Sequence, residues 1–389
     1  MAALPDQPTS ASELNDRYAR LNQMNWWDQR RVSEARVLIA GAGAIGNEVI
    51  KLLALSGVHN LTIVDFDKIE LTNLTRSILF RESDVAKSKS VVAAYRAREI
   101  DPESRAIGIE GDIEFDIGLG IYRSMDAVIG CLDSINARLA LNRACLHAGV
   151  PWLNGGIEDV FGEVSLYAGS AACFECGMTD SMWNRRNIRF SCGGQRISIP
   201  ADGAPTTAIA ASIIAGYLVN EVLLLFHSGS LENKEGMRPG QKIVISLKPY
   251  DFQVVDLTKN PSCTAHEQWS PVHALHVRPD KITTHELLTL TDSSNDVVEI
   301  GYDLLTEMTC VKCGATQEIL LPVEKSNAAL TVCPHCGDET RRPTTVSWID
   351  RHSPLAHMPL SALQIPQHQI VAVNGAGGRK YYQLGGDNF

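Results

Sequence analysis

The chain lacks an excess of positive charge, a secretory leader pattern and a long uninterrupted apolar run. Its 45 acidic residues outnumber its 35 basic ones, which gives a net charge of −10. Because phosphate contacts need a basic face, this balance argues against a general nucleic-acid binder. Residues 1–15 are polar and lack the charged-then-apolar order of a signal peptide. The most apolar window, residues 208–226, is interrupted by Ser212, Asn220 and Glu221, which favours a buried or interface helix over a membrane span. We therefore expect a cytoplasmic protein without nucleic-acid or membrane partners.

The length and the pattern of apolar segments predict an α/β fold. A chain of 389 residues favours two domains. Short apolar segments, expected to be strands, alternate with amphipathic ones, expected to be helices; the strands are at 36–40, 61–64 and 127–131, and the helices at 47–56, 87–100 and 136–148. This alternation predicts a Rossmann-like, mostly parallel sheet covered on both faces, with a ligand at the carboxyl ends of its strands.

Further expectations concern the two ends of the chain and the region after residue 151. We expect a helical arm over residues 1–30, and a domain over 31–275 that contains a crossover loop at about 177–205. Residues 162–169 and 242–255 are expected to add antiparallel strands, and 207–226 a long helix. Residues 280–389 are expected to form a separate small unit.

The spacing of the ten cysteines points to zinc. Three C-x-x-C pairs are present, a spacing that indicates metal ligands in a reducing compartment; they are Cys173 with Cys176, Cys310 with Cys313, and Cys333 with Cys336. The last two pairs are about twenty residues apart, as in a zinc ribbon, and are predicted to hold a structural Zn²⁺ in the C-terminal unit. A redox role for these pairs is the alternative.

A glycine-rich motif follows the first expected strand. It contains Gly41, Gly43 and Gly46, and Asp65 ends the next strand. Glycines in such a turn let the backbone approach a phosphate at a helix amino end, and an acid at the second strand accepts from a ribose hydroxyl. Many dehydrogenases share this motif, so an NAD-dependent oxidoreductase is one alternative.

Four polar residues that follow are better explained by ATP chemistry; they are Asn73, Arg76, Lys89 and Asp133. Asn73, Arg76 and Lys89 would hold the triphosphate. Asp133, at a strand end, would bind Mg²⁺ through one carboxylate. Taken singly, the first three could be solvated surface residues and Asp133 a helix N-cap.

With Arg17-Tyr-x-Arg20, these motifs have the order and spacing of the ubiquitin-activating and ThiF/MoeB superfamily, which the chain resembles over roughly residues 15–266. The resemblance implies an ATP-dependent, homodimeric adenylyltransferase in which Arg20 enters the ATP site of the other subunit. A guanidinium suits the charge that develops on the α-phosphate. The resemblance also implies that Cys173 and Cys176 share a structural Zn²⁺ with Cys263 and His266, although cysteine is usual where His266 stands. Two unrelated pairs are the alternative.

Cys192 is the candidate nucleophile. Arg189 and Arg196 lie near it in the sequence, and nearby positive charge raises the thiolate fraction of a cysteine. Enzymes that form a thioester place their cysteine in this crossover loop, before a segment similar to Pro205-Thr206-Thr207. The alternative is that Cys192 is an unreactive thiol in a loop. Cys131 and Cys145 lie in apolar segments and are expected to be inert core residues.

The resemblance implies the activation of a ubiquitin-like protein. Its C-terminal glycine would be adenylated and passed to Cys192 as a thioester, and a ubiquitin-conjugating-like enzyme would collect it. Arg20, Asp133 and Cys192 would be the catalytic residues. The chain looks most like the short homodimeric members, including those encoded in bacterial ubiquitin-like conjugation operons with a role in antiphage defence. The main alternative is a sulfur-carrier-protein adenylyltransferase of the thiamine or molybdopterin type, without thioester transfer; a non-catalytic scaffold is another.

Overall fold

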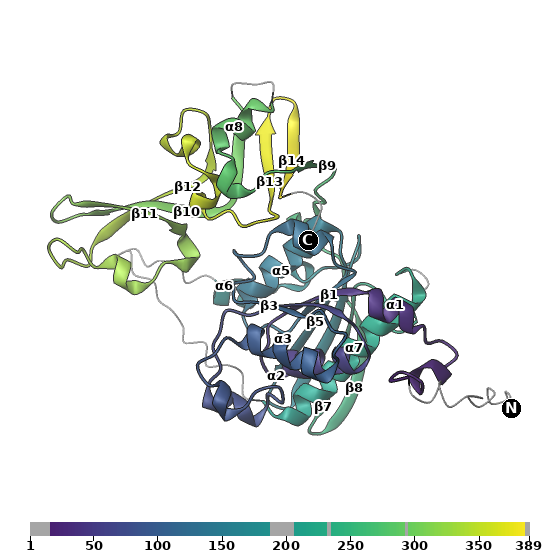
Figure 1. Ribbon diagram of the computed structural model, residues 1–389. Coiled ribbons are helices and arrows are strands. Elements are labelled where there is room, and N and C mark those ends of the chain that lie inside the picture. Colours follow the sequence, from purple (N-terminus) through teal and green to yellow (C-terminus); the bar gives the residue numbers. More distant parts are fainter. Residues whose placement is uncertain (1–15, 187–205, 232–234, 292–294, 386–389) are drawn as a thin grey trace. The chain divides into compact units, whose positions relative to one another are not determined.

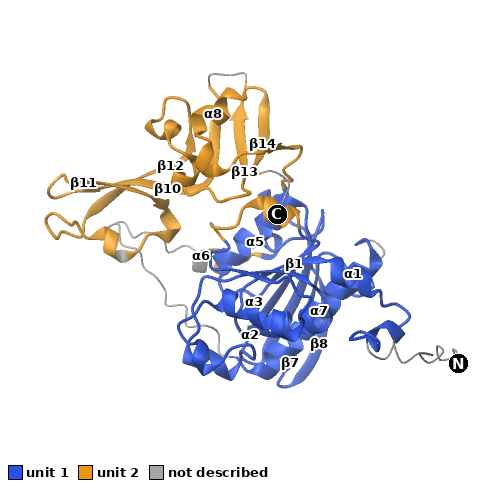
Figure 2. Cartoon of the chain, viewed as in Figure 1, with its two compact units in different colours: residues 1–113, 125–177, 203–266 blue, residues 114–124, 178–202, 267–389 orange. Residues whose placement is uncertain are grey.

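The computed structural model describes residues 16–186, 206–231, 235–291 and 295–385 (Figure 1). The chain divides into two compact units, coloured separately in Figure 2. Unit 1 comprises residues 1–113, 125–177 and 203–266, and unit 2 comprises residues 114–124, 178–202 and 267–389. Each unit has its own sheet and its own apolar core.

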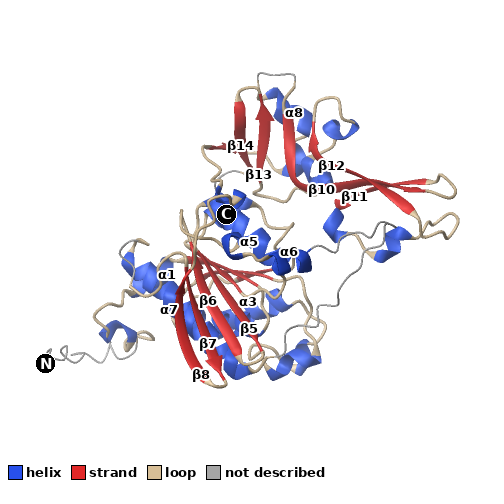
Figure 3. Cartoon of the chain, turned by 180° about the vertical axis from the view of Figure 1, so that it is seen from behind, coloured by secondary structure: helices blue, strands red, loops and turns tan. Residues whose placement is uncertain are grey.

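Unit 1 is built on an eight-stranded sheet in the order β3-β2-β1-β4-β5-β6-β7-β8. The first five strands in this order are parallel: β1 (Arg36–Ala40), β2 (Asn60–Val64), β3 (Ile107–Ile109), β4 (Ala127–Gly130) and β5 (Trp152–Glu158). Three antiparallel strands continue the sheet: β6 (Phe161–Tyr167), β7 (Gln241–Leu247) and β8 (Tyr250–Asp256) (Figure 3). The predicted Rossmann-like, mostly parallel sheet is confirmed.

Helices cover both faces of this sheet. Figure 1 shows α5 (Ile135–Ala148) on one side, and α2 (Ala44–Leu55), α3 (Lys89–Ile100) and α7 (Ala208–Ser228) on the other. Apolar residues of β1, β2, α2 and α7 form the main core. Helix α5 ends at Gly149, whose φ of 73° in the left-handed region is accessible to glycine at little cost.

Helix α7 is long and apolar enough to cross a membrane, judged by length and composition alone. In unit 1, however, it packs on α2, β5 and β6. A Cβ on Gly155 would lie 2.6 Å from Leu218, and one on Gly162 would lie 2.4 Å from Ile214. The two glycines therefore let this helix approach the sheet closely, as expected for a core helix.

The first described residues differ from the helix expected over residues 1–30. Residues 16–28 form turns and a short 3-10 helix, Leu21–Gln23, and α1 (Gln29–Glu34) is the first α-helix. The side chain of Asp16 accepts from the backbone N–H of Tyr18 at 3.0 Å, a local bond that competes with a helix. Within the expected crossover loop, residues 180–186 form α6 (Asp180–Arg186).

Unit 2 has a six-stranded sheet. Five strands run in the order β11-β10-β13-β14-β9, and β12 pairs with β10. The strands are β9 (Val272–Leu275), β10 (Val297–Cys310), β11 (Thr316–Pro322), β12 (Arg341–Ile349), β13 (Ile370–Gly375) and β14 (Gly378–Leu384). The short helix α8 (Thr284–Thr289) is capped at its amino end by a capping box between Thr283 and Glu286.

Unit 2 also includes residues 114–124, which lie between β3 and β4 in the sequence. Their helix α4 (Leu119–Arg123) contacts β14. The backbone N–H of Gly120 donates to the carbonyl of His368 at 2.8 Å, and Arg123 donates to the side chain of Gln383 at 2.7 Å. The C-terminal unit is thus completed by a segment far away in the sequence.

Candidate functional site

The turn between β1 and α2 has the shape of a phosphate-binding loop. Gly41 has a φ of +94°, and a Cβ there would lie 2.6 Å from the carbonyl oxygen of Cys131. A Cβ on Gly46 would lie 2.0 Å from the carbonyl oxygen of Gly41. At Gly43, in contrast, a Cβ would meet no atom within 4 Å. Gly41 and Gly46 are therefore required by the fold, whereas Gly43 borders open space at the amino end of α2.

The amino end of α2 suits an anion. Gly43 is its N-cap and supplies no side chain to the first backbone N–H groups of the helix. Such N–H groups and the helix dipole attract negative charge. The residues of this turn therefore fit the phosphates of a nucleotide.

Asp65 closes the loop from the end of β2. One carboxylate oxygen accepts from the backbone N–H of Ala42 at 2.7 Å, and the other accepts from the N–H of Asp67 at 2.7 Å. Burial raises the pKa of Asp65, although these N–H groups and Lys89 oppose the shift. Each oxygen retains a lone pair, as acceptance from a ribose hydroxyl requires.

Lys89, the first residue of α3, lies beside this acid. Its Nζ is 2.7 Å from a carboxylate oxygen of Asp67, and its backbone N–H donates to the Asp67 carbonyl at 3.0 Å. The ammonium group is thus held by Asp67, two residues from Asp65. Asp67 was not among the predicted site residues, although it stands in the same sequence motif.

Asn73 and Arg76 lie in and after the 3-10 helix Leu71–Thr75. Asn73 is buried, and its side-chain oxygen accepts from the N–H of Glu70 at 2.9 Å. Arg76 donates to the carbonyl of Thr72 at 3.0 Å. Their roles toward a triphosphate remain predictions.

Asn47 is a residue of the site that the sequence did not reveal. Fully buried, it donates to the carbonyls of Ala42 at 2.6 Å and Gly43 at 3.1 Å, and accepts from the N–H of Leu79 at 2.9 Å. It therefore ties the glycine turn to the segment that follows Arg76. The only sequence signal for it is a polar side chain at the start of a helix.

Asp133 is exposed and follows β4, the parallel neighbour of β1. Ala40 and Gly130 are register partners at the ends of these strands, so the glycine turn and the segment before Asp133 lie at one edge of the sheet. Ser134 caps α5 by accepting from the N–H of Ala137, so the reading of Asp133 as the N-cap is wrong. An exposed carboxylate at this edge fits a Mg²⁺ ligand.

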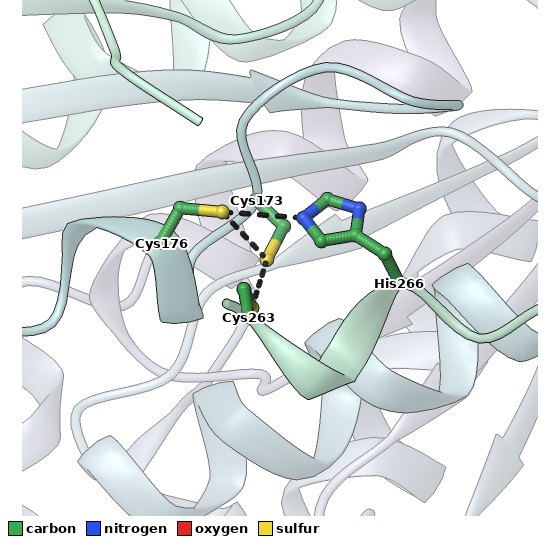
Figure 4. Close-up of side chains that lie close together, drawn as sticks. All are labelled: Cys173, Cys176, Cys263 and His266. Atoms are coloured by element: carbon green, nitrogen blue, oxygen red, sulfur yellow. Dashed lines mark hydrogen bonds between the residues drawn. The ribbon is translucent and has the colours of Figure 1, made fainter. Parts of the chain in front are cut away.

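The first cysteine cluster joins two distant segments of unit 1 (Figure 4). The Sγ atom of Cys173 lies 3.7 Å from that of Cys176 and 3.8 Å from that of Cys263, and the Cys176 Sγ lies 3.2 Å from Nε2 of His266. A tetrahedral Zn²⁺ with Zn–S bonds of about 2.3 Å would hold two sulfurs about 3.8 Å apart. Burial lowers the pKa of His266, which favours the neutral imidazole that binds metal. The four residues fit a Cys₃His zinc site.

Helix α5 supports this cluster. The guanidinium of Arg143 donates to both oxygens of the buried Glu175 carboxylate, at 2.7 and 3.0 Å, and the Asn142 side chain accepts from the N–H of Phe174 at 3.0 Å. Both contacts hold the turn between Cys173 and Cys176. The two half-sites therefore meet as the resemblance implied, and the alternative of two unrelated pairs loses its support.

The second cluster lies in unit 2 at the ends of β10 and β12. Its sulfurs lie 3.7 Å apart in the pairs Cys310–Cys336 and Cys313–Cys333, and its four ligand atoms all lie within 4.8 Å of one another. Two matching turns build it: the N–H of Gly314 donates to the Cys310 carbonyl at 3.0 Å, and the N–H of Gly337 to the Cys333 carbonyl at 2.9 Å. Both glycines have φ near +70°. The cluster fits a four-cysteine zinc ribbon.

The remaining predicted residues divide into described and undescribed ones. Arg20 is exposed, and its side chain makes no hydrogen bond or ion pair with the other described residues. Cys192 lies outside the described residues. Burial raises the pKa of the Cys131 thiol to about 12 and that of Cys145 well above its usual value, as expected of inert thiols.

Comparison with known proteins gives the family. The model of the ThiF family matches residues 15–265. The chain is 32% identical over 168 residues to SUMO-activating enzyme subunit 2 of Dictyostelium discoideum, covering 42% of this chain and 25% of that protein. It is 28% identical over 254 residues to ubiquitin-like modifier-activating enzyme 5 of Oryza sativa subsp. japonica, covering 60% of this chain and 56% of that protein. The chain thus spans between a quarter and about half of these relatives.

A solved structure shares the fold. The crystal structure of E. coli MccB with ATP superposes with a TM-score of 0.53 and 24% identity, covering 65% of this chain and 74% of that one. The match of the family model to well over half of the chain, on the segments that build the glycine turn, Asp65 and Asp133, is decisive: this chain belongs to the ThiF family.

Proposed function

We propose that this protein activates a ubiquitin-like protein with ATP. A C-terminal carboxylate oxygen attacks the α-phosphorus, the bond from phosphorus to the bridging oxygen of pyrophosphate breaks, and an acyl adenylate forms. The observation that carries the proposal is the open amino end of α2 at Gly43, with Asp65, Lys89 and Asp133 at the same edge of the sheet. Two relatives are named as a SUMO-activating enzyme subunit and a ubiquitin-like modifier-activating enzyme, and these names support a ubiquitin-like protein as the substrate.

Each residue of the candidate site has a proposed role that follows from its position. The backbone of the glycine turn would receive the phosphates and Asp65 the ribose. Lys89 would exchange its contact with Asp67 for the triphosphate, assisted by Asn73 and Arg76. Asp133 would hold Mg²⁺, which neutralises phosphate charge when bound. Catalysis then consists of positioning and charge stabilisation.

Arg20 would act on the ATP site of a second subunit in a homodimer. Its exposure and its lack of partners among the described residues support this role. A guanidinium suits charge that develops on the α-phosphate during attack.

We further propose that the Cys192 thiolate attacks the acyl carbon of the adenylate, the acyl–phosphate bond breaks and AMP leaves. The resulting thioester then passes its acyl group to a thiol of a conjugating enzyme, which frees Cys192. Seven of the nine described cysteines lie in the two clusters, and burial raises the pKa values of the other two, Cys131 and Cys145. Cys192 is thus the cysteine left for this step. A cytoplasmic location and a role in antiphage defence belong to the same proposal.

A gel assay tests the two steps. Wild type, Cys192→Ala and Asp133→Ala are incubated with ATP, Mg²⁺ and either ubiquitin or SUMO, with and without a reducing thiol. We expect a thiol-sensitive adduct in wild type alone, and pyrophosphate exchange in wild type and Cys192→Ala but not in Asp133→Ala. Exchange without any adduct in wild type would instead support the sulfur-carrier type of adenylyltransferase and remove Cys192 from the mechanism.

A further inference from the structure

Residues 16–28, the described part of the N-terminal arm, are joined to the end of α3. The hydroxyl of Tyr18 donates to a carboxylate oxygen of Asp101 at 3.0 Å, and this hydrogen bond is buried. Arg17 lies 3.8 Å from the other oxygen of Asp101 and donates to the carbonyl of Ile100. Tyr18 is 8% exposed and Asp101 only 1%. Arg17 and Tyr18, which precede Arg20 in the Arg17-Tyr-x-Arg20 motif, thus anchor this segment.

Asp101 is itself held rigidly. It is the C-cap residue of α3, with its N–H bonded to the Ala97 carbonyl at 2.9 Å. Its carboxylate also accepts from the N–H of Glu103 at 3.1 Å, and Nε2 of His59 lies 3.4 Å away. A Cβ on Gly57 would lie 2.6 Å from the Tyr18 ring and hydroxyl, so the tyrosine fits closely over this glycine.

A second contact holds the other end of the arm. The rings of Trp26 and Trp27 lie 5.0 and 5.1 Å from that of His227, near the end of α7. Nε2 of His227 accepts from the N–H of Asp28 at 2.8 Å, and Nδ1 lies 2.7 Å from the Leu223 carbonyl. Because a carbonyl only accepts, the proton is on Nδ1 and both ring nitrogens are used. Arg20 lies between two fixed points.

We propose that the Tyr18–Asp101 pair positions Arg20 for the adenylation reaction. The inference rests on the proposed function and assigns the pair a role through Arg20, without contact with the substrate. Helix α3 begins at Lys89 and ends next to Asp101, a length of about 18 Å for its twelve residues. Helix α3 therefore links Lys89, a predicted nucleotide-binding residue, to Asp101 of the anchor. Arg20, two residues beyond that anchor, is presented at the end of α3 opposite Lys89, as action on a second subunit requires.

The test is a double-mutant cycle with Tyr18→Phe and Arg20→Ala, which removes one hydroxyl and one guanidinium. The readout is ATP–pyrophosphate exchange with ubiquitin or SUMO. Tyr381→Phe is the matched control, because the Tyr381 hydroxyl also donates to a carboxylate, that of Glu267, at 3.0 Å in unit 2. We expect Tyr18→Phe to lower kcat about tenfold at an unchanged KM for ATP, since an interaction made only in the transition state affects kcat. In the Arg20→Ala background the same change has no further effect.

A second readout needs no substrate. Trypsin cleavage after Arg17 and Arg20 is expected about fivefold faster in Tyr18→Phe than in wild type or Tyr381→Phe, because a released anchor frees the backbone. Equal losses of kcat in both backgrounds, no loss at all, or unchanged cleavage would overturn the inference. If wild type shows no exchange with either modifier while cleavage changes as expected, the anchor stands and the proposed function fails.

Discussion

Two substitutions, Gly43→Ala and Gly46→Ala, each add one methyl group to the same turn. They distinguish a glycine that nucleotide binding requires from one that the fold requires. At Gly43, where φ is −74° and ψ −152°, alanine is unstrained, and a Cβ meets nothing within 4 Å. Gly43→Ala should therefore fold normally, with a stability within about 1 kcal/mol of wild type, because lost unfolded-state freedom and a poorer N-cap oppose each other. The methyl group would point into the space that a phosphate needs. We expect ATP affinity to fall about 100-fold, or roughly 2.7 kcal/mol.

The second substitution, Gly46→Ala, should do the reverse. Its Cβ would lie 2.0 Å from the carbonyl oxygen of Gly41, which is backbone and cannot rotate away. The turn would have to move by more than about 1 Å, at a cost of about 3 kcal/mol. For a unit of this size that cost lowers the unfolding temperature by about 6–12 °C.

Thermal unfolding and titration with ATP measure the two effects. Gly43→Ala should unfold at nearly the wild-type temperature and bind ATP about 100-fold more weakly, whereas Gly46→Ala should unfold at a lower temperature. ATP affinity equal to that of wild type in Gly43→Ala would refute the placement of the phosphates at this turn. An unchanged unfolding temperature in Gly46→Ala would refute the steric argument.

Three further predictions concern the metal, the phosphates and the fold. His266→Ala should lower the zinc content from two ions per chain to one, as measured by metal analysis, because the second cluster is complete without it. Lys89→Ala should raise the KM for ATP at least tenfold with little change in stability, since its partner Asp67 is half exposed. Burial raises the pKa of Asp84, but hydrogen bonds from Lys87 and Arg96 outweigh it and lower that pKa. Asp84→Asn should therefore cost about 1–3 kcal/mol at pH 7; denaturant unfolding should show this difference above the ordinary Asp pKa of about 3.9 and its loss as the pH falls further through the lowered pKa.

The sequence predicted the parts of the fold that repeat a local signal. Alternating apolar segments predicted β1, β2 and β4. The cysteine spacing predicted the second cluster, and the family resemblance implied the first. The short β3 has only three residues, two of them half-buried, so it carries no apolar run. Residues 16–28 were expected to be helical, but Asp16 and the contacts of the two tryptophans hold them in turns.

The contacts that hold the site together depend on tertiary structure. Asn47 and Asp101 act through partners more than thirty residues away, and no local pattern announces such pairs. Likewise, residues 114–124 follow β3 in sequence but complete unit 2, because the groups that bind α4 lie in the last part of the chain. Motif spacing and the family resemblance predicted the candidate site residues, whereas the side chains that hold these segments in place could be identified only from the structure.

ATP–pyrophosphate exchange measures the proposed adenylation step itself. Purified wild type and Asp133→Ala are incubated with ATP, Mg²⁺, radiolabelled pyrophosphate and a modifier, ubiquitin or SUMO, with a free or an amidated C-terminus. We expect label in ATP only for wild type incubated with a modifier whose C-terminal carboxylate is free. Exchange that survives amidation of the modifier or the loss of Asp133 would contradict the proposed adenylation. So would the absence of exchange when ubiquitin and SUMO both have a free C-terminus.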